Sequence, residues 1–105
     1  MSEMETMADT CELRPVIGLT LGLSVADLEA LTADAIRKHR QLVENADRLF
    51  QALPDHYKSG VAVGGAQHLG YIDAMIAMHA QLKALNTLLD VLGYIPEVET
   101  ARENS

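Results

Sequence analysis

The sequence predicts an all-α protein built from two long antiparallel helices. Three observations support this class. Aromatic residues make up only 4% of the chain and Trp is absent, a composition typical of helix packing rather than of a β-sandwich core. Apolar residues recur at helical spacing in two segments, 24–53 and 67–92. A connector with three glycines, 54–66, separates the two segments.

The length of 105 residues leaves room for one domain and one modest core. We expect a single helical domain over 12–96, with polar tails at 1–11 and 97–105 that carry no hydrophobic period. Within that domain, the segment 12–23 holds Pro15, Gly18 and Gly22, which forbid a long helix. This segment is therefore predicted to be an irregular apolar arm with room for one helical turn.

The first long helix is predicted to begin at Ser24, because a Ser hydroxyl can accept a hydrogen bond from the free backbone amides of a helix start. Asp27 adds a negative charge at the positive end of the helix. Apolar residues form one stripe and charged residues the opposite side, where Asp34 and Lys38 have the spacing of an ion pair. Pro54 ends this helix after residue 53.

The second helix, 67–92, is apolar over most of its circumference, and Gly93 followed by Pro96 marks its end. A hairpin covers only one face of each helix, and an apolar patch that stays exposed marks an interface. We therefore predict a homodimer in which two hairpins form a four-helix bundle. Its interface is assigned to the residues with coiled-coil spacing: Met75, Met78, Leu82, Leu85, Leu89 and Leu92.

The net charge and the lack of targeting patterns limit the classes of partner and the location that we expect. A net charge of −7 repels nucleic-acid phosphates, so direct DNA or RNA binding is disfavoured, whereas a basic protein partner is favoured. The apolar tract 72–92 contains too many polar groups for a bilayer span: Asp73, Gln81, Lys83 and Asp90. The acidic, polar start lacks the pattern of a secretory signal, and one cysteine, Cys11, cannot form an internal disulfide. We expect a cytoplasmic protein without a membrane partner.

Residues that carry chemistry are scattered. His39, His56, His68 and His79 form none of the pairs that bind zinc or a di-iron centre, so we expect no metal and no cofactor. His39 lies within the apolar stripe of the first helix, which indicates a hydrogen-bonded core or interface residue. A pH-sensitive dimer is the other interpretation of His39.

An enzyme is disfavoured for a related reason. A small all-α enzyme of the chorismate-mutase type collects Arg and Lys inside its bundle, whereas Arg37, Arg40 and Arg48 face the predicted solvent side. The glycine-rich connector lacks the Lys-Ser/Thr of a phosphate-binding loop. We expect neither catalysis nor a small-molecule ligand, with the enzyme and a generic helical dimeric scaffold as the alternatives.

Five sequence strings cover most of the chain from Glu12 to Pro96: ELRPVIGLT, ADLEALTADAIRKHRQLVENADRLFQALP, YKSG, GGAQHLGYIDAMIAMHAQLKALNTLL and LGYIP. In these strings the chain resembles the TraM family of quorum-sensing antiactivators. The resemblance implies a homodimeric helical protein that binds TraR, a LuxR-type activator, and blocks its DNA binding, which represses conjugal transfer genes.

The family pattern also implies which residues contact the activator. It places Arg14, Pro15 and Leu19 of the arm, and Leu53 and Pro54 at the end of the first helix, in the partner-binding surface. A packing role stays open for the second group. Leu53 could complete the core stripe, and Pro54 is a good helix stop whatever the function.

Overall fold

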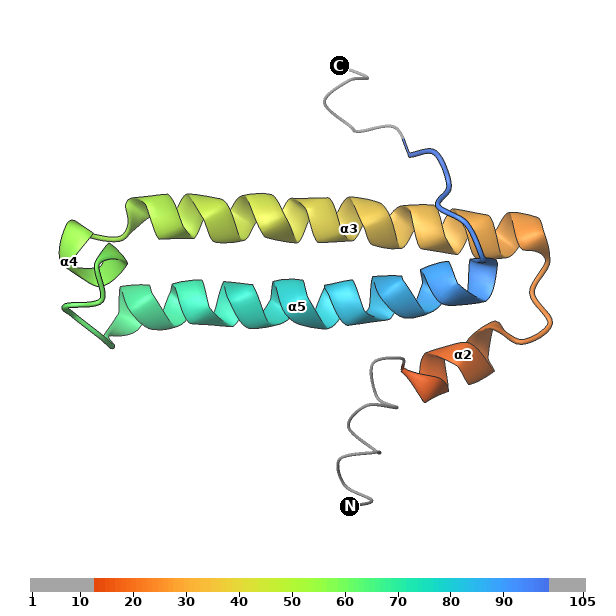
Figure 1. Cartoon of the computed structure of the whole chain (residues 1–105), viewed down its shortest axis with the longest axis horizontal. Coiled ribbons are helices and arrows are strands. Elements are labelled where there is room, and N and C mark those ends of the chain that lie inside the picture. Colours follow the sequence, from red (N-terminus) through yellow and green to blue (C-terminus); the bar gives the residue numbers. More distant parts are fainter. Residues whose placement is uncertain (1–12, 99–105) are drawn as a thin grey trace.

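The computed structural model describes residues 13–98, and this part of the chain is helical without strands. Its elements are α2 (Arg14–Thr20), α3 (Val25–Ala52), α4 (Asp55–Lys58) and α5 (Ala66–Leu92). Helices α3 and α5 run antiparallel as a long hairpin, and α2 lies beside the C-terminal end of α5, on the side away from α3 (Figure 1). No described helix is both long and apolar enough to cross a membrane.

Helix α3 occupies the segment where the sequence predicts a helix over 24–53. The hydroxyl of its N-cap, Ser24, accepts a hydrogen bond from the Asp27 amide at 3.0 Å, which confirms the predicted helix start. Lys38 Nζ lies 3.4 Å from a carboxylate oxygen of Asp34, which confirms the predicted ion pair. At the other end, Leu53 is the C-cap and Pro54 follows in an extended conformation.

Helix α5 is bounded by glycines whose φ angles are positive. Gly65, with φ of 91°, precedes it, and Gly93, with φ of 92°, closes it in the left-handed conformation that L side chains rarely adopt. The Gly93 amide donates a hydrogen bond of 2.8 Å to the Leu89 carbonyl, which satisfies a carbonyl of the last turn. The predicted role of Gly93 as the helix end is confirmed.

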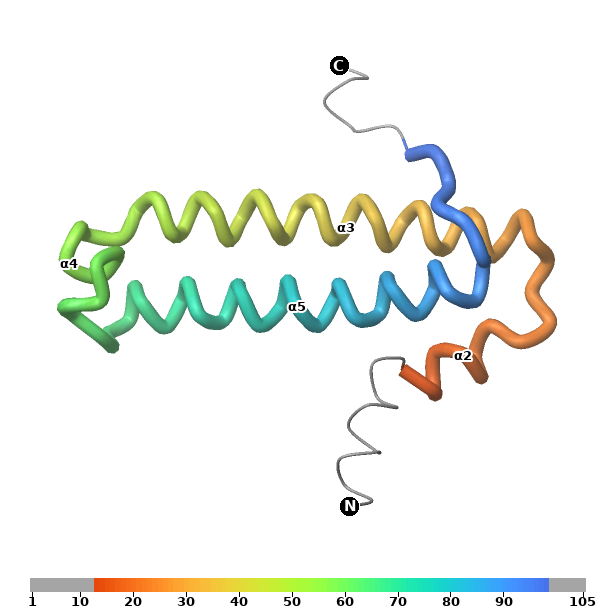
Figure 2. The backbone as a smooth tube through the Cα atoms, viewed as in Figure 1, coloured from red at the N-terminus to blue at the C-terminus, as the bar shows by residue number. Residues whose placement is uncertain are grey.

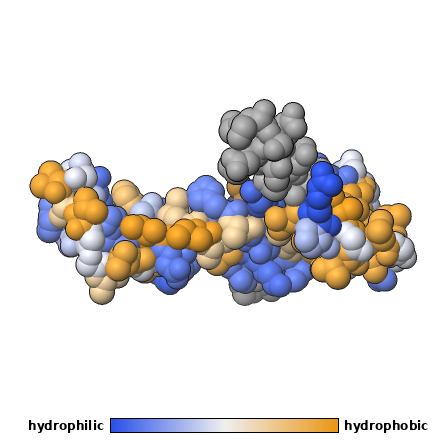
Figure 3. Space-filling view, turned by 90° about the horizontal axis from the view of Figure 1, so that it is seen from below, coloured by the Kyte–Doolittle hydropathy of each residue, from blue (hydrophilic) through white to orange (hydrophobic). Residues whose placement is uncertain are grey.

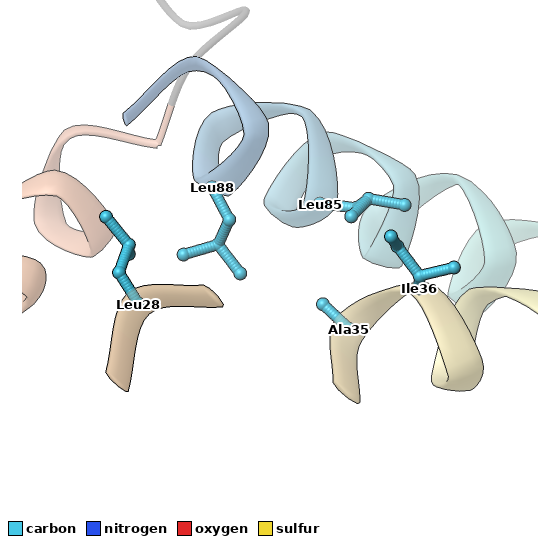
Figure 4. Close-up of a cluster of buried hydrophobic side chains, with 5 residues drawn as sticks. All are labelled: Leu28, Ala35, Ile36, Leu85 and Leu88. Carbon is cyan, nitrogen blue, oxygen red and sulfur yellow. The ribbon is translucent and has the colours of Figure 1, made fainter. Parts of the chain in front are cut away.

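The hydrophobic core lies between α3 and α5, toward the end of the hairpin where α3 begins. Its buried side chains point toward one another across the two helices (Figure 4), and they are Leu28, Ala35, Ile36, Leu85 and Leu88. Apolar residues from α2, from the end of α5 and from the C-terminal segment pack against this cluster: Val16, Leu89, Leu92 and Val98. The core therefore joins the hairpin to both terminal segments.

The structure differs from the sequence prediction in two connecting segments. The arm is more helical than predicted, because residues Arg14–Thr20 form the seven-residue helix α2, and 21–23 after it remain outside a helix. Pro15 is tolerated since it lies in the first turn, where an amide has no helical partner. The connector 54–66 contains the short helix α4, which the prediction lacks. Figure 2 shows the backbone turning back at this end of the hairpin through α4 and the glycine-containing segment after it.

Candidate protein-interaction site

The side of α5 that faces away from α3 is apolar and partly uncovered. We call this surface the outer face of α5. Leu69, Ile72 and Ile76 are exposed along it, Ile76 to 62%. A shallow groove follows it, lined by Tyr71, Ile72, Met75, Ile76, His79, Ala80 and Lys83. Figure 3, which views the molecule from this side, shows hydrophobic side chains running in a band from the α4 end toward the middle.

The C-terminal part of the outer face is covered by α2. Leu69, Ile76 and Thr87 lie along one line of the helix, because separations of seven and eleven residues are close to whole turns of 3.6 residues. The Leu13 amide donates a hydrogen bond of 2.9 Å to Thr87 Oγ1, which itself donates to the Lys83 carbonyl at 3.0 Å. Thr87 is fully buried as a result. One helix face is thus covered near its end and uncovered near its start.

The first group of predicted partner-binding residues lies on α2. Arg14, Pro15 and Leu19 are all exposed, and Leu19 is exposed to 81%. Leu21, at the C-cap of the same helix, is exposed to 77%. An exposed Leu pair on a short helix that is itself held by the core is a surface suited to contacting another protein.

The second group lies at the opposite end of the hairpin. Leu53 is only 4% exposed and its amide donates to the Phe50 carbonyl, so the structure places this residue in the core stripe. Pro54 is half-buried and forms the N-cap of α4. Within one chain, the length of α3 separates these residues from Leu19, and its 28 residues span about 42 Å.

The six predicted dimer-interface residues do not share one environment within the chain. Leu85 is 6% exposed in the hairpin core, and Leu89 and Leu92 pack against that core. Met78 and Leu82 are half-buried. Met75 is also half-buried, and it is the one of the six that lines the groove of the outer face. Sequence spacing missed the outer face, because α5 is apolar on both sides and its period does not say which side meets α3.

The segment 59–65, between α4 and α5, carries two exposed branched side chains on a backbone fixed by hydrogen bonds. Val61 and Val63 are exposed to 81% and 80%. The Gly64 amide donates to His68 Nδ1 at 2.8 Å, and the Ala62 amide donates to the His56 carbonyl at 2.8 Å. The structure therefore presents both valines in a defined arrangement.

The C-terminal segment after α5 crosses the start of α3. Tyr94 Oη donates a hydrogen bond of 2.7 Å to a carboxylate oxygen of Glu29, and Pro96 is buried. This hydrogen bond to the carboxylate raises the pKa of Tyr94 above its usual value of 10.0, with desolvation and the charge of Glu29 acting in the same direction. The contact fastens the segment to α3.

Two of the four histidines pack against one tyrosine ring: the ring centroids of His56 and His68 lie 4.9 and 5.5 Å from that of Tyr57. The described residues contain no group of three or more His, Cys, Asp or Glu side chains that could hold a metal ion. His39 Nε2 is buried, and no described protein group lies within hydrogen-bonding distance of it, which differs from the predicted hydrogen-bonded role. Cys11 lies outside the described residues. The arginines that the sequence predicts at the solvent side are exposed: Arg37, Arg40 and Arg48.

A helical hairpin that leaves apolar surface uncovered belongs to the class of small helical proteins suited to binding another protein. Comparison with known proteins identifies the family of the chain. The family model described as "Prokaryotic Transcriptional repressor TraM" matches residues 1–97. The chain is 64% identical over 95 residues to "Transcriptional repressor TraM" of Agrobacterium fabrum strain C58, covering 90% of this chain and 93% of that protein. Its identity to "Transcriptional repressor TraM" of Rhizobium radiobacter is 66% over 87 residues, covering 83% and 85%.

The fold agrees with that assignment. The crystal structure of a second quorum sensing antiactivator, TraM2, from A. tumefaciens strain A6 superposes with a TM-score of 0.83. The two sequences are 68% identical, and the alignment covers 84% of this chain and 99% of that one. The chain therefore belongs to the TraM family of transcriptional repressors, and it is a quorum-sensing antiactivator.

Proposed function

We propose that this chain represses transcription by binding a LuxR-type activator of the TraR class and blocking its DNA binding, so that conjugal transfer genes stay silent. The observation that carries the proposal is the 68% identity and TM-score of 0.83 to an antiactivator of known structure. A net charge of −7 supports a protein partner with a basic DNA-binding domain over nucleic acid itself. The proposed place of action is the cytoplasm, where such an activator meets DNA.

The proposed working form is a homodimer with the outer face of α5 at its centre. Ile72 and Ile76 are exposed there, and Met75 extends the same groove. Burying this surface against a second copy removes apolar area from water at about 25 cal/mol per Å². Two hairpins joined in this way form a four-helix bundle, with Met78 and Leu82 at the edges of the contact and Leu85, Leu89 and Leu92 on the core side of α5.

The proposed activator-binding residues divide into direct and supporting roles. Arg14, Pro15 and Leu19 are exposed, so they are available to contact the activator. Leu53 is buried, so its contribution is to hold the end of α3 in shape, and Pro54 fixes the turn that follows. This proposal carries no catalytic, metal or small-molecule step.

A gel mobility-shift experiment tests the function. A TraR-class activator bound to its DNA site is titrated with the purified chain, and release of free DNA is expected at excess of the chain. Leu19→Asp places a charge on the proposed contact and should weaken release by tenfold or more, whereas Val25→Asp, a comparable change at another exposed apolar position, should release DNA like the wild type. Retention of the shifted band at several-fold excess of the wild-type chain would refute the proposal.

The same experiment separates the two alternatives. A generic helical scaffold leaves the activator on its DNA. A small all-α enzyme of the chorismate-mutase type also leaves it there, and requires basic side chains gathered in a pocket, whereas Arg37, Arg40 and Arg48 are exposed on α3. DNA release by a chain with those three arginines intact therefore favours the antiactivator over both alternatives.

A further inference from the structure

A second groove lies between the start of α3 and the C-terminal segment that crosses it. We call it the α3 groove. Its volume is about 440 Å³, room for a few side chains of a partner segment. Its lining comes from 26–33 of α3 and from the segment 94–97, so the proposed dimer contact, which uses the outer face of α5, does not include these residues.

The side of the α3 groove that α3 supplies is made mostly of small side chains. Ala26, Ala30 and Ala33 follow one another at separations of four and three residues, which places them on one face of the helix. Ala26 and Ala30 are exposed, and Ala33 is buried. How closely two elements pack depends on the side chains between them, so this alanine face lets the backbone of a partner segment come close to α3.

The C-terminal segment forms the other side and is fastened at alternate residues. Tyr94 is hydrogen-bonded to α3, Pro96 is buried, and Val98 packs against the hydrophobic core. The residues between them, Ile95 and Glu97, are both exposed, Ile95 to 77%. The α3 groove therefore has an apolar and an acidic side chain held in place on one of its sides.

The charge around the α3 groove is negative. Glu29 is half-buried, and one of its carboxylate oxygens accepts the hydrogen bond from Tyr94. An ionised carboxylate has about four acceptor sites, so Glu29 can accept further hydrogen bonds from a cation. The stretch 25–36 contains three acidic residues and the stretch 93–98 contains one, Glu97, and neither stretch contains Lys or Arg. A partner segment that complements this groove is basic.

We propose that the α3 groove binds a basic segment of the activator, with an Arg or Lys side chain between Glu29 and Glu97 and an apolar side chain against Ile95 and the alanine face. This inference rests on the proposed function and adds a contact surface to it. A DNA-binding domain carries basic side chains for the phosphates, so it is the part of the activator with the matching charge. Figure 1 shows that α2, which carries the proposed contact Leu19, lies at the same end of the hairpin.

Charge reversal tests the role of Glu97. Surface plasmon resonance at about 0.15 M salt measures the affinity of a purified TraR-class activator for each variant of the full chain. Glu97→Lys should weaken binding by about fivefold or more, because the groove then repels a basic segment. Asp47→Lys makes the same charge change at another exposed position and should change the affinity less than about twofold. Asp47 lies 18 residues from Glu29, about 27 Å along α3, whereas exposed charges are screened over about 8 Å at this salt concentration.

A second variant fills the α3 groove without changing its charge. Ala30→Leu places a larger side chain on the exposed part of the alanine face and should also weaken binding by about fivefold. Gln41→Leu, at another exposed position of α3, should bind like the wild type. Circular dichroism of each variant checks that its helix content is unchanged.

Salt distinguishes the two variants. At about 1 M salt the screening distance falls to about 3 Å, so Glu97→Lys should come within about twofold of the wild type at that concentration, whereas Ala30→Leu should keep its loss. A loss in Glu97→Lys that persists at this salt concentration would contradict the charged contact.

The remaining outcomes separate this inference from the proposed function. If the wild-type chain releases DNA from the activator while Glu97→Lys and Ala30→Leu bind the activator as tightly as the wild type, the groove contact is wrong and the function stands. A wild-type chain that does not bind the activator overturns both. Sedimentation equilibrium should give the same mass for Glu97→Lys and the wild type. A wild-type dimer that becomes a monomer in Glu97→Lys would show that a second copy occupies the groove, which overturns the inference.

Discussion

The inner and outer faces of α5 have similar side chains and different surroundings. On the inner face, Leu85 and Leu88 are packed against α3 and almost fully buried. On the outer face, Ile72 and Ile76 remain exposed until α2 covers the helix near Thr87. Helix α3 shows no such conflict, because charged residues occupy its other side. Helix α5 therefore has apolar surface on two sides. One chain covers the inner face with α3 and only the C-terminal part of the outer face with α2.

The largest effect is expected on the inner face. Leu85→Ala removes a buried side chain and leaves a cavity between the helices, so the free energy of unfolding should fall by about 2–5 kcal/mol. Urea unfolding followed by circular dichroism measures the change. Val25→Ala, at an exposed position, serves as the control and should change stability by about 0.5 kcal/mol or less. Equal losses in the two variants would contradict the assignment of Leu85 to the core.

The next largest loss of stability is expected where α2 covers the outer face of α5. Thr87→Val keeps the shape of the side chain and removes the oxygen that accepts from the Leu13 amide. A buried donor left without a partner costs about 1–3 kcal/mol, and α2 should detach more readily. Limited proteolysis should then cut the chain near α2 faster than in the wild type. An unchanged cleavage rate would show that α2 is held by other contacts.

Two glycines, Gly70 inside α5 and Gly93 at its C-cap, test the backbone of the helix rather than the packing of its inner or outer face. Gly93→Ala places a side chain at φ of 92° and should destabilise the protein by about 1–2 kcal/mol. Gly70→Ala lies inside the helix with open space around the added carbon, and should stabilise it by about 0.5–1 kcal/mol. Thermal unfolding measures both, and shifts of the same sign would contradict this account of α5.

The smallest effect concerns the C-terminal segment. Tyr94 should titrate with a pKa above 10.0, and Glu29→Gln, which removes the charge of the acceptor, should return it toward that value. Because the folded pKa exceeds the unfolded one, this contact stabilises the fold below pH 10.0 and is lost as the pH rises through the folded pKa. Tyrosinate absorbance measures the titration, with Tyr94→Phe subtracting the two other tyrosines. A Tyr94 titration that is the same in Glu29→Gln would refute the contact.

The helices and their ends could be predicted from the sequence, because the signals that set them are local. Ser24 and Gly93 act on backbone groups within a few residues, so their roles are visible in the chain itself. For 12–23 the sequence predicts an irregular arm with room for one helical turn, whereas the structure has the seven-residue helix α2, whose N-cap residue Leu13 is hydrogen-bonded to Thr87, 74 residues away. A contact between residues so far apart in the chain leaves no signal in local spacing.

The candidate site was predictable only in part. Apolar excess on α5 indicates an interface, yet the spacing selected Leu85, which the structure places in the hairpin core. Which apolar residues of α5 stay uncovered depends on how α3 and α2 pack against it. The structure shows in this way that Ile76 is exposed. The activator-contacting residues came from family resemblance, since nothing in the spacing of Arg14 and Leu19 names a partner.

One measurement tests the central claim that the outer face of α5 joins two copies. Sedimentation equilibrium at micromolar concentration should give a dimer for the wild-type chain and a monomer for Ile76→Glu, because the charge falls in the apolar contact. The variant should keep its helix content, since Ile76 lies outside the hairpin core. A wild-type chain that sediments as a monomer, or an Ile76→Glu variant that remains a dimer, would contradict the account.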